Sequence, residues 1–282
     1  MTCWPTQKGG KKRLRRVNVA ENGSIVEGRY LYCLVNGNTE MNFGQMGIEG
    51  SLVYTVPYDD IGAVVHRCEA KPYRTTDTEK AKEWVLAHQY IVDYTTKTFG
   101  TVIPFTFDTI FKGNDETVRG WLKEKHQPLK DLLMRLKDRD EYGVQIFLER
   151  SSIEKEMEVD EEIRELKRQV ESTSTGTAYL LEKRLEQRLN NKKMAIVSGY
   201  TETFFNQIKG MVDRVKIHPK NRGVPEEWKD KEVILNLLCL VHKDMVRGLG
   251  SFLGEVNSRG RFAVRFSGPW PPYSFVERLE SE

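Results

Sequence analysis

The first half of the chain carries five strand-like runs of apolar residues. The first, 30–35, is an almost unbroken series of β-favouring residues and predicts a central strand. Shorter runs follow at 52–57 and 61–66, another occupies 101–107, and the last, 142–148, alternates as a strand does. We interpret 142–148 as the strand that completes the sheet of a first domain.

Two helix-like patterns separate these strands. Thr76 or Asp77 is a suitable N-cap for the first helix, and Gly100 is expected to end it. The inner stripe expected for this helix comprises Ala81, Trp84, Val85, Ala87, Tyr90, Ile91 and Tyr94. The second helix begins at Asp115, and Pro128 should kink or divide it. Two helices over one antiparallel or mixed sheet predict a ferredoxin-like α+β plait.

A charge-rich helical region follows the first domain. Its first apolar stripe comprises Val159, Ile163, Leu166 and Val170, which recur at the spacing of a coiled-coil seam. A second stripe resumes after an interruption at 172–176. Two antiparallel helices would satisfy both stripes, and a single bent helix is the alternative. We therefore expect a coiled-coil-like helical arm.

The last part of the chain repeats the alternation of helix and strand. A helix is expected from about Tyr200, then a strand over 233–241 that is apolar on both faces, a helix over 243–256 and a strand over 261–266. The fold class is thus predicted to be α+β, with two ferredoxin-like α/β plait domains joined by the arm. The predicted divisions are a basic leader at 1–27, the first domain at 28–150, the arm at 151–193, and the second domain with its tail at 194–282.

Residues 267–276 hold three prolines and three aromatic residues. Each proline fixes φ at about −65° and removes a backbone donor, so this tail is stiff and extended. Its rings expose much apolar surface unless they dock on the chain's own core or on a partner. The tail is therefore either a C-terminal clamp that holds the last strand in its domain, or a partner-binding surface.

Composition describes a globular chain. It has 282 residues, of which 39% are hydrophobic and 30% charged, enough for two cores. Apolar runs long enough for a membrane helix, or for a signal peptide, are not found in the sequence, so we expect a cytoplasmic protein without membrane contact. The four cysteines are scattered and expected to be reduced.

Charge is unevenly distributed. Six of the 44 basic residues lie within 1–16, where no acid occurs, which leaves 38 basic and 41 acidic residues in the remainder. We expect the leader to be disordered. A nucleic-acid partner is not expected, because the leader alone would give weak and salt-sensitive contact.

Candidate catalytic and cofactor-binding patterns have ordinary structural interpretations. The spacing GxGxxxG at 248–254 is one residue too long for a dinucleotide loop and lies within an amphipathic segment. His88 and His126 fall on inner or boundary faces of helices, where a satisfied core histidine is commoner than a general base. Cys239 lies in an apolar strand, which favours an inert thiol. We predict no catalytic residue, no cofactor and no metal.

Several separated segments together resemble one protein family. They are the strand 30–35, the helix around 88–89, the run 102–111, the strand 141–144, the turn 176–181 and the tail 267–275. Their order and spacing are similar to those of the gas vesicle synthesis proteins GvpF and GvpL, over about residues 28 to 276. The resemblance implies a two-domain α+β accessory protein of gas vesicle assembly, without catalytic activity. It also implies contact with the small hydrophobic shell protein and with other accessory proteins.

These implications lead to a hypothesis of function. We expect a non-enzymatic adaptor, cytoplasmic and associated with gas vesicles, that binds a shell protein of the GvpA type and other gas vesicle proteins. The expected contact surfaces are the tail, the edge at 102–111 and the arm. The candidate partner-binding residues are Trp270, Tyr273, Phe275, Phe105, Phe107 and Phe111. The alternative is an enzyme or small-ligand-binding protein that uses the cleft between the domains.

Overall fold

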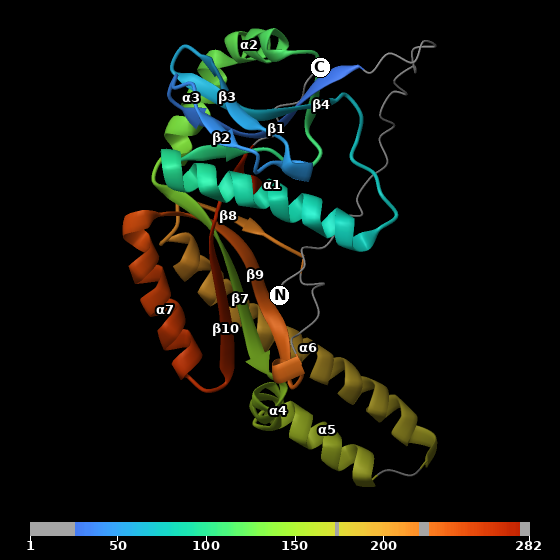
Figure 1. Ribbon diagram of the computed structural model, residues 1–282. Coiled ribbons are helices and arrows are strands. Elements are labelled where there is room, and N and C mark those ends of the chain that lie inside the picture. Colours follow the sequence, from blue (N-terminus) through green and yellow to red (C-terminus); the bar gives the residue numbers. More distant parts are fainter. Residues whose placement is uncertain (1–25, 173–174, 220–225, 277–282) are drawn as a thin grey trace.

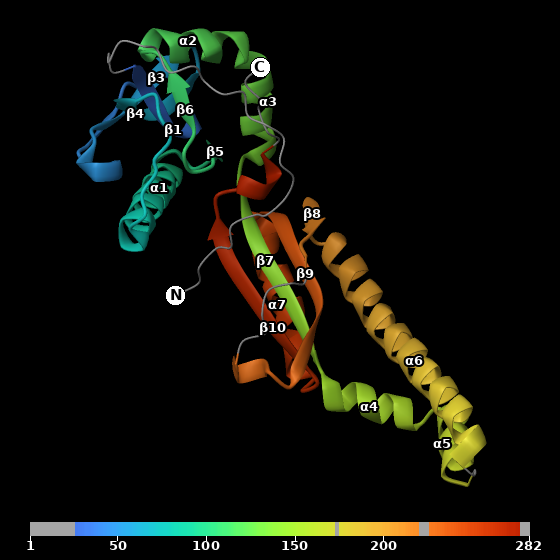
Figure 2. The same cartoon turned by 90° about the vertical axis from the view of Figure 1, so that its right-hand side faces the viewer.

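The computed structural model describes residues 26–172, 175–219 and 226–276. In this part of the chain, helices accompany two antiparallel sheets, and a helical arm extends from the second sheet (Figures 1 and 2). Most of the predicted leader lies outside the described residues. Across the described ranges, no helix combines the length and the apolarity that crossing a membrane requires.

The first sheet is built around β1 (Glu27–Asn36). Its strand order is β2 (Asn42–Gly44), β3 (Val53–Tyr58), β4 (Ile61–Glu69), β1 and β5 (Val102–Pro104), and β6 (Ile110–Lys112) also pairs with β1. The eight central residues of β1 are all buried. Burial on both sides is what a central strand requires when both faces of its sheet are covered. The predicted central strand is therefore confirmed.

Helices cover both faces of the first sheet. Helix α1 (Thr78–Phe99) packs on one face through side chains such as Trp84 and Ile91. Helices α2 (Asp115–Glu124) and α3 (His126–Leu136) pack on the other face through their leucines. The ferredoxin-like plait expected here, with both helices over one face, is wrong for this sheet. The reason is that β1 presents apolar side chains in both directions.

Local sequence sets the helix ends as predicted. The Asp77 carboxylate accepts hydrogen bonds from the backbone N–H groups of Glu79 and Lys80, at 2.9 and 3.2 Å, and so caps α1. Gly100 follows the helix with φ of 83°, a conformation that glycine adopts without steric cost. Pro128 lies in the first turn of α3, where a missing N–H is tolerated. The predicted division of the second helix is confirmed.

The arm contains α4 (Arg150–Glu158), α5 (Glu161–Ser172) and the first part of α6 (Thr175–Lys209). Asp160, just before α5, forms an ion pair with Arg188 of α6 at 3.0 Å. The start of α5 therefore lies beside the middle of α6, and the two helices run antiparallel (Figure 2). Helix α6 continues past the expected end of the arm without a break, because its last turns pack under the second sheet.

The second sheet has the strand order β10-β7-β9-β8. Its strands are β7 (Arg139–Glu149), β8 (Arg214–Ile217), β9 (Lys231–His242) and β10 (Phe262–Trp270). Helices α6 and α7 (Val246–Ser258) pack on one face, so β7, α6, β8, β9, α7 and β10 follow a β-α-β-β-α-β order. The prediction that β7 completes the first sheet is wrong, because β7 forms hydrogen bonds with β9 and β10.

Candidate partner-binding surfaces

The C-terminal tail lies against both sheets. Strand β10 extends to Trp270 at the edge of its sheet, the position where a sheet tolerates Pro269. Beyond it, Phe275 is only 1% exposed, in a cluster that also holds Leu240 of β9 and the leucines of α3. Its ring therefore belongs to a core shared by the first half of the chain and the second sheet. The tail docks on the chain's own core, as the clamp interpretation expects.

Polar contacts fix the tail beside this ring. The backbone N–H and the hydroxyl of Ser274 each donate to the buried carboxylate of Glu141 at 2.7 Å. Burial raises the pKa of Glu141, and the two donated hydrogen bonds oppose that rise. The Lys216 ammonium donates to the Ser274 carbonyl and lies 5.5 Å from the centre of the Phe275 ring. The tail is thus held by hydrogen bonds as well as by apolar packing.

Tyr273 and Phe107 pack on the other face of the first sheet, beneath α1. The Tyr273 hydroxyl lies 3.5 Å from Nε2 of His88. The Phe107 ring lies 6.1 Å from the same imidazole and 6.2 Å from the ring of Tyr30. The structure therefore brings these two predicted residues together, but partly buried against the core cluster under α1.

The other predicted aromatic residues lie elsewhere. Phe105 and Phe111 contact Trp121 of α2, with ring centres 6.1 and 5.0 Å apart. Trp270 is half-buried and pairs with Glu141 across β10 and β7. The six candidates thus divide between both faces of the first sheet and the edge of the second. They do not form one exposed patch.

Histidine and tyrosine side chains form a buried network beneath α1. The Tyr30 hydroxyl lies 2.9 Å from Nδ1 of His88, and the Tyr32 hydroxyl lies 2.8 Å from Nδ1 of His66. Nε2 of His66 lies 3.0 Å from the Tyr73 hydroxyl. Burial lowers the pKa of both histidines to about 4, so both are neutral near pH 7. The prediction of a satisfied core histidine at His88 is confirmed.

Three of the four cysteines lie in the described part of the chain, and Cys33, Cys68 and Cys239 are free thiols. Burial raises the pKa of Cys33 and of Cys239 to about 12, which keeps both thiols protonated and unreactive near neutral pH. The prediction of an inert buried thiol at Cys239 is confirmed. Cys3 lies outside the described residues.

One group has the composition of a cation site. Asp59 and Asp60, in the turn between β3 and β4, and His126 of α3 bring three possible ligand atoms within 4.8 Å of one another. Nε2 of His126 lies 2.7 Å from Asp60, and Lys130 contacts the other oxygen of that carboxylate. The bonds from Lys130 and His126 lower the pKa of Asp60. Because an ammonium already neutralises the carboxylate, the group is better explained as an ion-pair cluster that joins the turn to α3.

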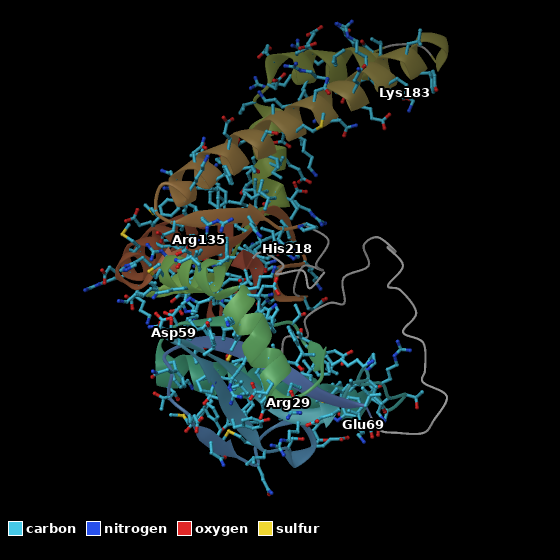
Figure 3. All side chains as sticks on the ribbon, turned by 90° about the horizontal axis from the view of Figure 1, so that it is seen from above. Arg29, Asp59, Glu69, Arg135, Lys183 and His218 are labelled. Atoms are coloured by element: carbon cyan, nitrogen blue, oxygen red, sulfur yellow. The ribbon has the colours of Figure 1, made fainter. Side chains whose placement is uncertain are left out.

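Exposed apolar side chains are found on the arm. Tyr179 and Leu180, near the turn between α5 and α6, are 62% and 68% exposed. Figure 3 shows Lys183, on the same part of α6, at the far end of the molecule from Arg29 and Asp59 of the first sheet. Apolar side chains on a projecting hairpin are accessible to a partner without any rearrangement of the core.

A second exposed apolar stripe runs along α1. It consists of Leu86, Tyr90 and Tyr94, which lie on the side of the helix away from the buried His88. The expectation that Val85, Tyr90 and Tyr94 belong to the inner stripe is wrong. The four-residue spacing of positions 86, 90 and 94 could have indicated this exposed stripe. It was hidden because α1 also has apolar residues on its buried side, and the two sets overlap along the sequence.

Comparison with known proteins shows which family this chain belongs to. The family model described as "Gas vesicle synthesis protein GvpL/GvpF" matches residues 28–277 of this chain. The chain belongs to the GvpL/GvpF family. The match includes both sheets, the arm and the tail, and it begins at the end of the stretch predicted to be a basic leader. The resemblance seen in the sequence is confirmed, and the chain is a gas vesicle-associated member of the GvpL/GvpF family.

Individual relatives agree with this assignment. Gas vesicle protein L of Haloferax mediterranei is 29% identical over 97% of this chain and 95% of that protein. Gas vesicle protein L1 of Halobacterium salinarum is 31% identical over 91% of this chain and 92% of that protein. The crystal structure of GvpF from Anabaena sp. PCC7120 has a TM-score of 0.72 at 16% identity, covering 90% of this chain and 100% of that chain. The GvpF fold is therefore retained where sequence identity is low.

Proposed function

We propose that this chain is a non-enzymatic accessory protein of gas vesicle assembly. It acts in the cytoplasm, where it binds the hydrophobic shell subunit, of the GvpA type, and other gas vesicle proteins. The observation that supports this proposal most strongly is the family match over residues 28–277, which extends through every part of the described fold.

The physical reason for such a partner lies in the chemistry of the shell. A subunit that ends in a gas-facing wall exposes apolar surface before it is assembled, and exposed apolar surface promotes aggregation. An accessory protein that covers this surface keeps the subunit available for assembly.

The arm is the surface best suited to that contact. Tyr179 and Leu180 extend from a hairpin that projects away from both sheets (Figure 2). Burying the exposed parts of these two side chains, about two-thirds of each, contributes roughly 2–4 kcal/mol before the cost of association. This energy suits a contact that holds a subunit and then releases it. The coiled-coil-like packing expected from the seam spacing would keep the hairpin stiff enough to present both side chains.

The six aromatic candidates have a different part in this proposal. Five of them are half-buried, namely Phe105, Phe107, Phe111, Trp270 and Tyr273. Their exposed edges can add to a partner contact along the first sheet and the tail. Phe275 is fully buried, and we assign it the role of holding the two sheets in a fixed relation so that the arm is presented correctly.

The contacts of His88 favour this proposal over a catalyst in the cleft between the domains. A general base needs a ring nitrogen that reaches the substrate. Nδ1 of His88 lies 2.9 Å from the Tyr30 hydroxyl, and Nε2 lies 3.1 Å from the carbonyl oxygen of Phe105. One ring nitrogen therefore joins α1 to β1, and the other joins α1 to the backbone at Phe105, so both are engaged in packing.

A pull-down with immobilised shell subunit tests the proposal. The arm variant carries Tyr179→Glu and Leu180→Glu, and Ile217→Glu is its matched control, because Ile217 is an exposed apolar residue on β8. We expect the wild-type chain and the control to be retained, and the arm variant to lose at least about tenfold in affinity. Circular dichroism establishes that all three are folded.

Two results contradict different parts of the proposal. If the wild-type chain is not retained on the shell subunit, the proposed function is wrong. If the arm variant is retained as well as the control, the function stands and the contact lies elsewhere, with Trp270→Ala as the next variant.

A further inference from the structure

The outer stripe of α1 is unusually apolar for a solvated helix face. Leu86, Tyr90 and Tyr94 are 66%, 55% and 41% exposed. Residues four apart on a helix are displaced by only about 40° around its axis, so the three side chains form one narrow ridge. Figure 1 shows α1 on the surface, crossing the molecule along the lower side of the first sheet. A ridge of this kind indicates a surface that another element covers.

The ridge has an ordered shape. The Tyr94 ring lies 6.0 Å from that of Phe43 on β2 and 6.3 Å from that of Tyr90, so its position is supported from both sides. Towards the other end, Leu86 and Tyr90 border a wide, open surface depression of about 800 Å³ along the first turns of α1, whose remaining lining side chains are mostly charged. The packed Tyr94 ring therefore lies at one end of the stripe, and the depression lies beside Leu86 at the other.

Two charges extend this pattern. Glu83 precedes Tyr90 by seven residues, Lys97 follows it by seven, and both side chains are exposed. Seven residues are nearly two helical turns, so both charges lie on the line of the ridge. A two-fold rotation about an axis through Tyr90 brings Glu83 to the position of Lys97 and Leu86 to the position of Tyr94. The stripe is therefore complementary to the same stripe on a second copy of the chain.

We propose that two copies of this chain associate through α1, in an antiparallel pair with a two-fold axis at Tyr90. In this pair Glu83 faces the partner's Lys97, Leu86 faces the partner's Tyr94, and the two Tyr90 rings meet at the axis. Each Tyr94 ring, fixed by Phe43 and Tyr90, packs on the exposed Leu86 side chain of the other copy. A two-fold contact uses the same patch on both subunits and closes after two, as a self-complementary stripe requires.

The proposed contact is small, so the dimer is weak. A single helix pair buries less area than the roughly 1,200–2,000 Å² typical of stable complexes. We expect a dissociation constant on the order of 1–100 µM, which increases with salt because two ion pairs are part of the contact. Such a dimer forms mainly where the protein is locally concentrated.

Sedimentation velocity of the full chain, over protein concentrations from about 2 to 200 µM, tests the proposal. The wild-type chain should change from monomer to dimer with concentration, and Tyr90→Glu should remain a monomer throughout. Lys97→Glu places two carboxylates face to face at each end and should weaken the dimer at least about tenfold. The double variant E83K and K97E restores opposite charges at both ends and should restore dimerisation.

The charge exchange is the decisive control, because a general loss of folding or solubility would not be reversed by adding a second substitution. A wild-type chain that stays monomeric at the highest concentration overturns the proposal and leaves the ridge to a different protein. A dimer that persists in Tyr90→Glu, or a double variant no stronger than Lys97→Glu, places the contact outside this stripe and equally overturns it.

Discussion

Replacing Phe275 with alanine tests whether the tail joins the two sheets energetically. The ring is 1% exposed and lies in a core that contains Leu240 from β9 and the leucines of α3. Removing a buried phenylalanine ring and leaving a cavity costs ~3–5 kcal/mol. Loss of the ring's contacts with Arg214 and Lys216 adds roughly 0.5–1 kcal/mol. Native proteins have a total stability of about 5–15 kcal/mol, so the expected loss is a large share of it.

Guanidinium unfolding, followed by circular dichroism and by tryptophan fluorescence, measures this loss. The two signals should separate in Phe275→Ala, because the halves of the chain then unfold less cooperatively. Phe266→Ala is the matched control. Its ring is 36% exposed and stacks on Tyr142 with ring centres 5.1 Å apart, so it should cost only about 1–2 kcal/mol. If Phe275→Ala costs no more than this control, the shared core does not exist as described.

Two further predictions concern charged and titratable groups. Burial lowers the pKa of His88 from 6.5 to about 4, so between these pH values the unfolded chain binds more protons and stability falls as pH falls. The histidine contributes roughly 3 kcal/mol to that fall, and His88→Gln should show a correspondingly flatter dependence when guanidinium midpoints are compared at pH 7, 5 and 4. An unchanged slope would mean that the imidazole is not titrating from a buried position. Asp60→Asn removes a partly exposed carboxylate that contacts His126 and Lys130, and should cost less than about 1 kcal/mol, and less still in high salt, by thermal unfolding. A loss above about 2 kcal/mol would mean that this cluster contributes more to stability than a partly exposed ion pair does.

Features that depend only on residues close together in the sequence could be predicted. The strand at 30–35 follows from a run of β-favouring side chains, and the ends of α1 follow from Asp77 and Gly100. The place of β7 could not be predicted in the same way. Alternation identifies the buried face of a strand, but it contains no information on which strands lie beside it. Strand β8 is short and charged, so its pattern carries little signal at all.

The candidate surfaces were predicted only in part. The tail's rigidity follows from its prolines, and its docking follows from its rings, but the choice of core depends on Leu240 and α3, which lie far away in sequence. The ridge on α1 was missed because apolar residues on its two sides merge into one apparent stripe. Family membership was predicted because the tail combines rare residues in a fixed order, and this signal does not require any knowledge of contacts.

The claim that this chain covers the apolar surface of a shell subunit is tested most directly by aggregation of that subunit. Purified shell subunit is diluted from denaturant into buffer, and light scattering is recorded with and without an equimolar amount of this chain. The account predicts that the wild-type chain suppresses scattering and that the arm variant with Tyr179→Glu and Leu180→Glu does not. Scattering that rises equally fast with and without the wild-type chain would contradict it.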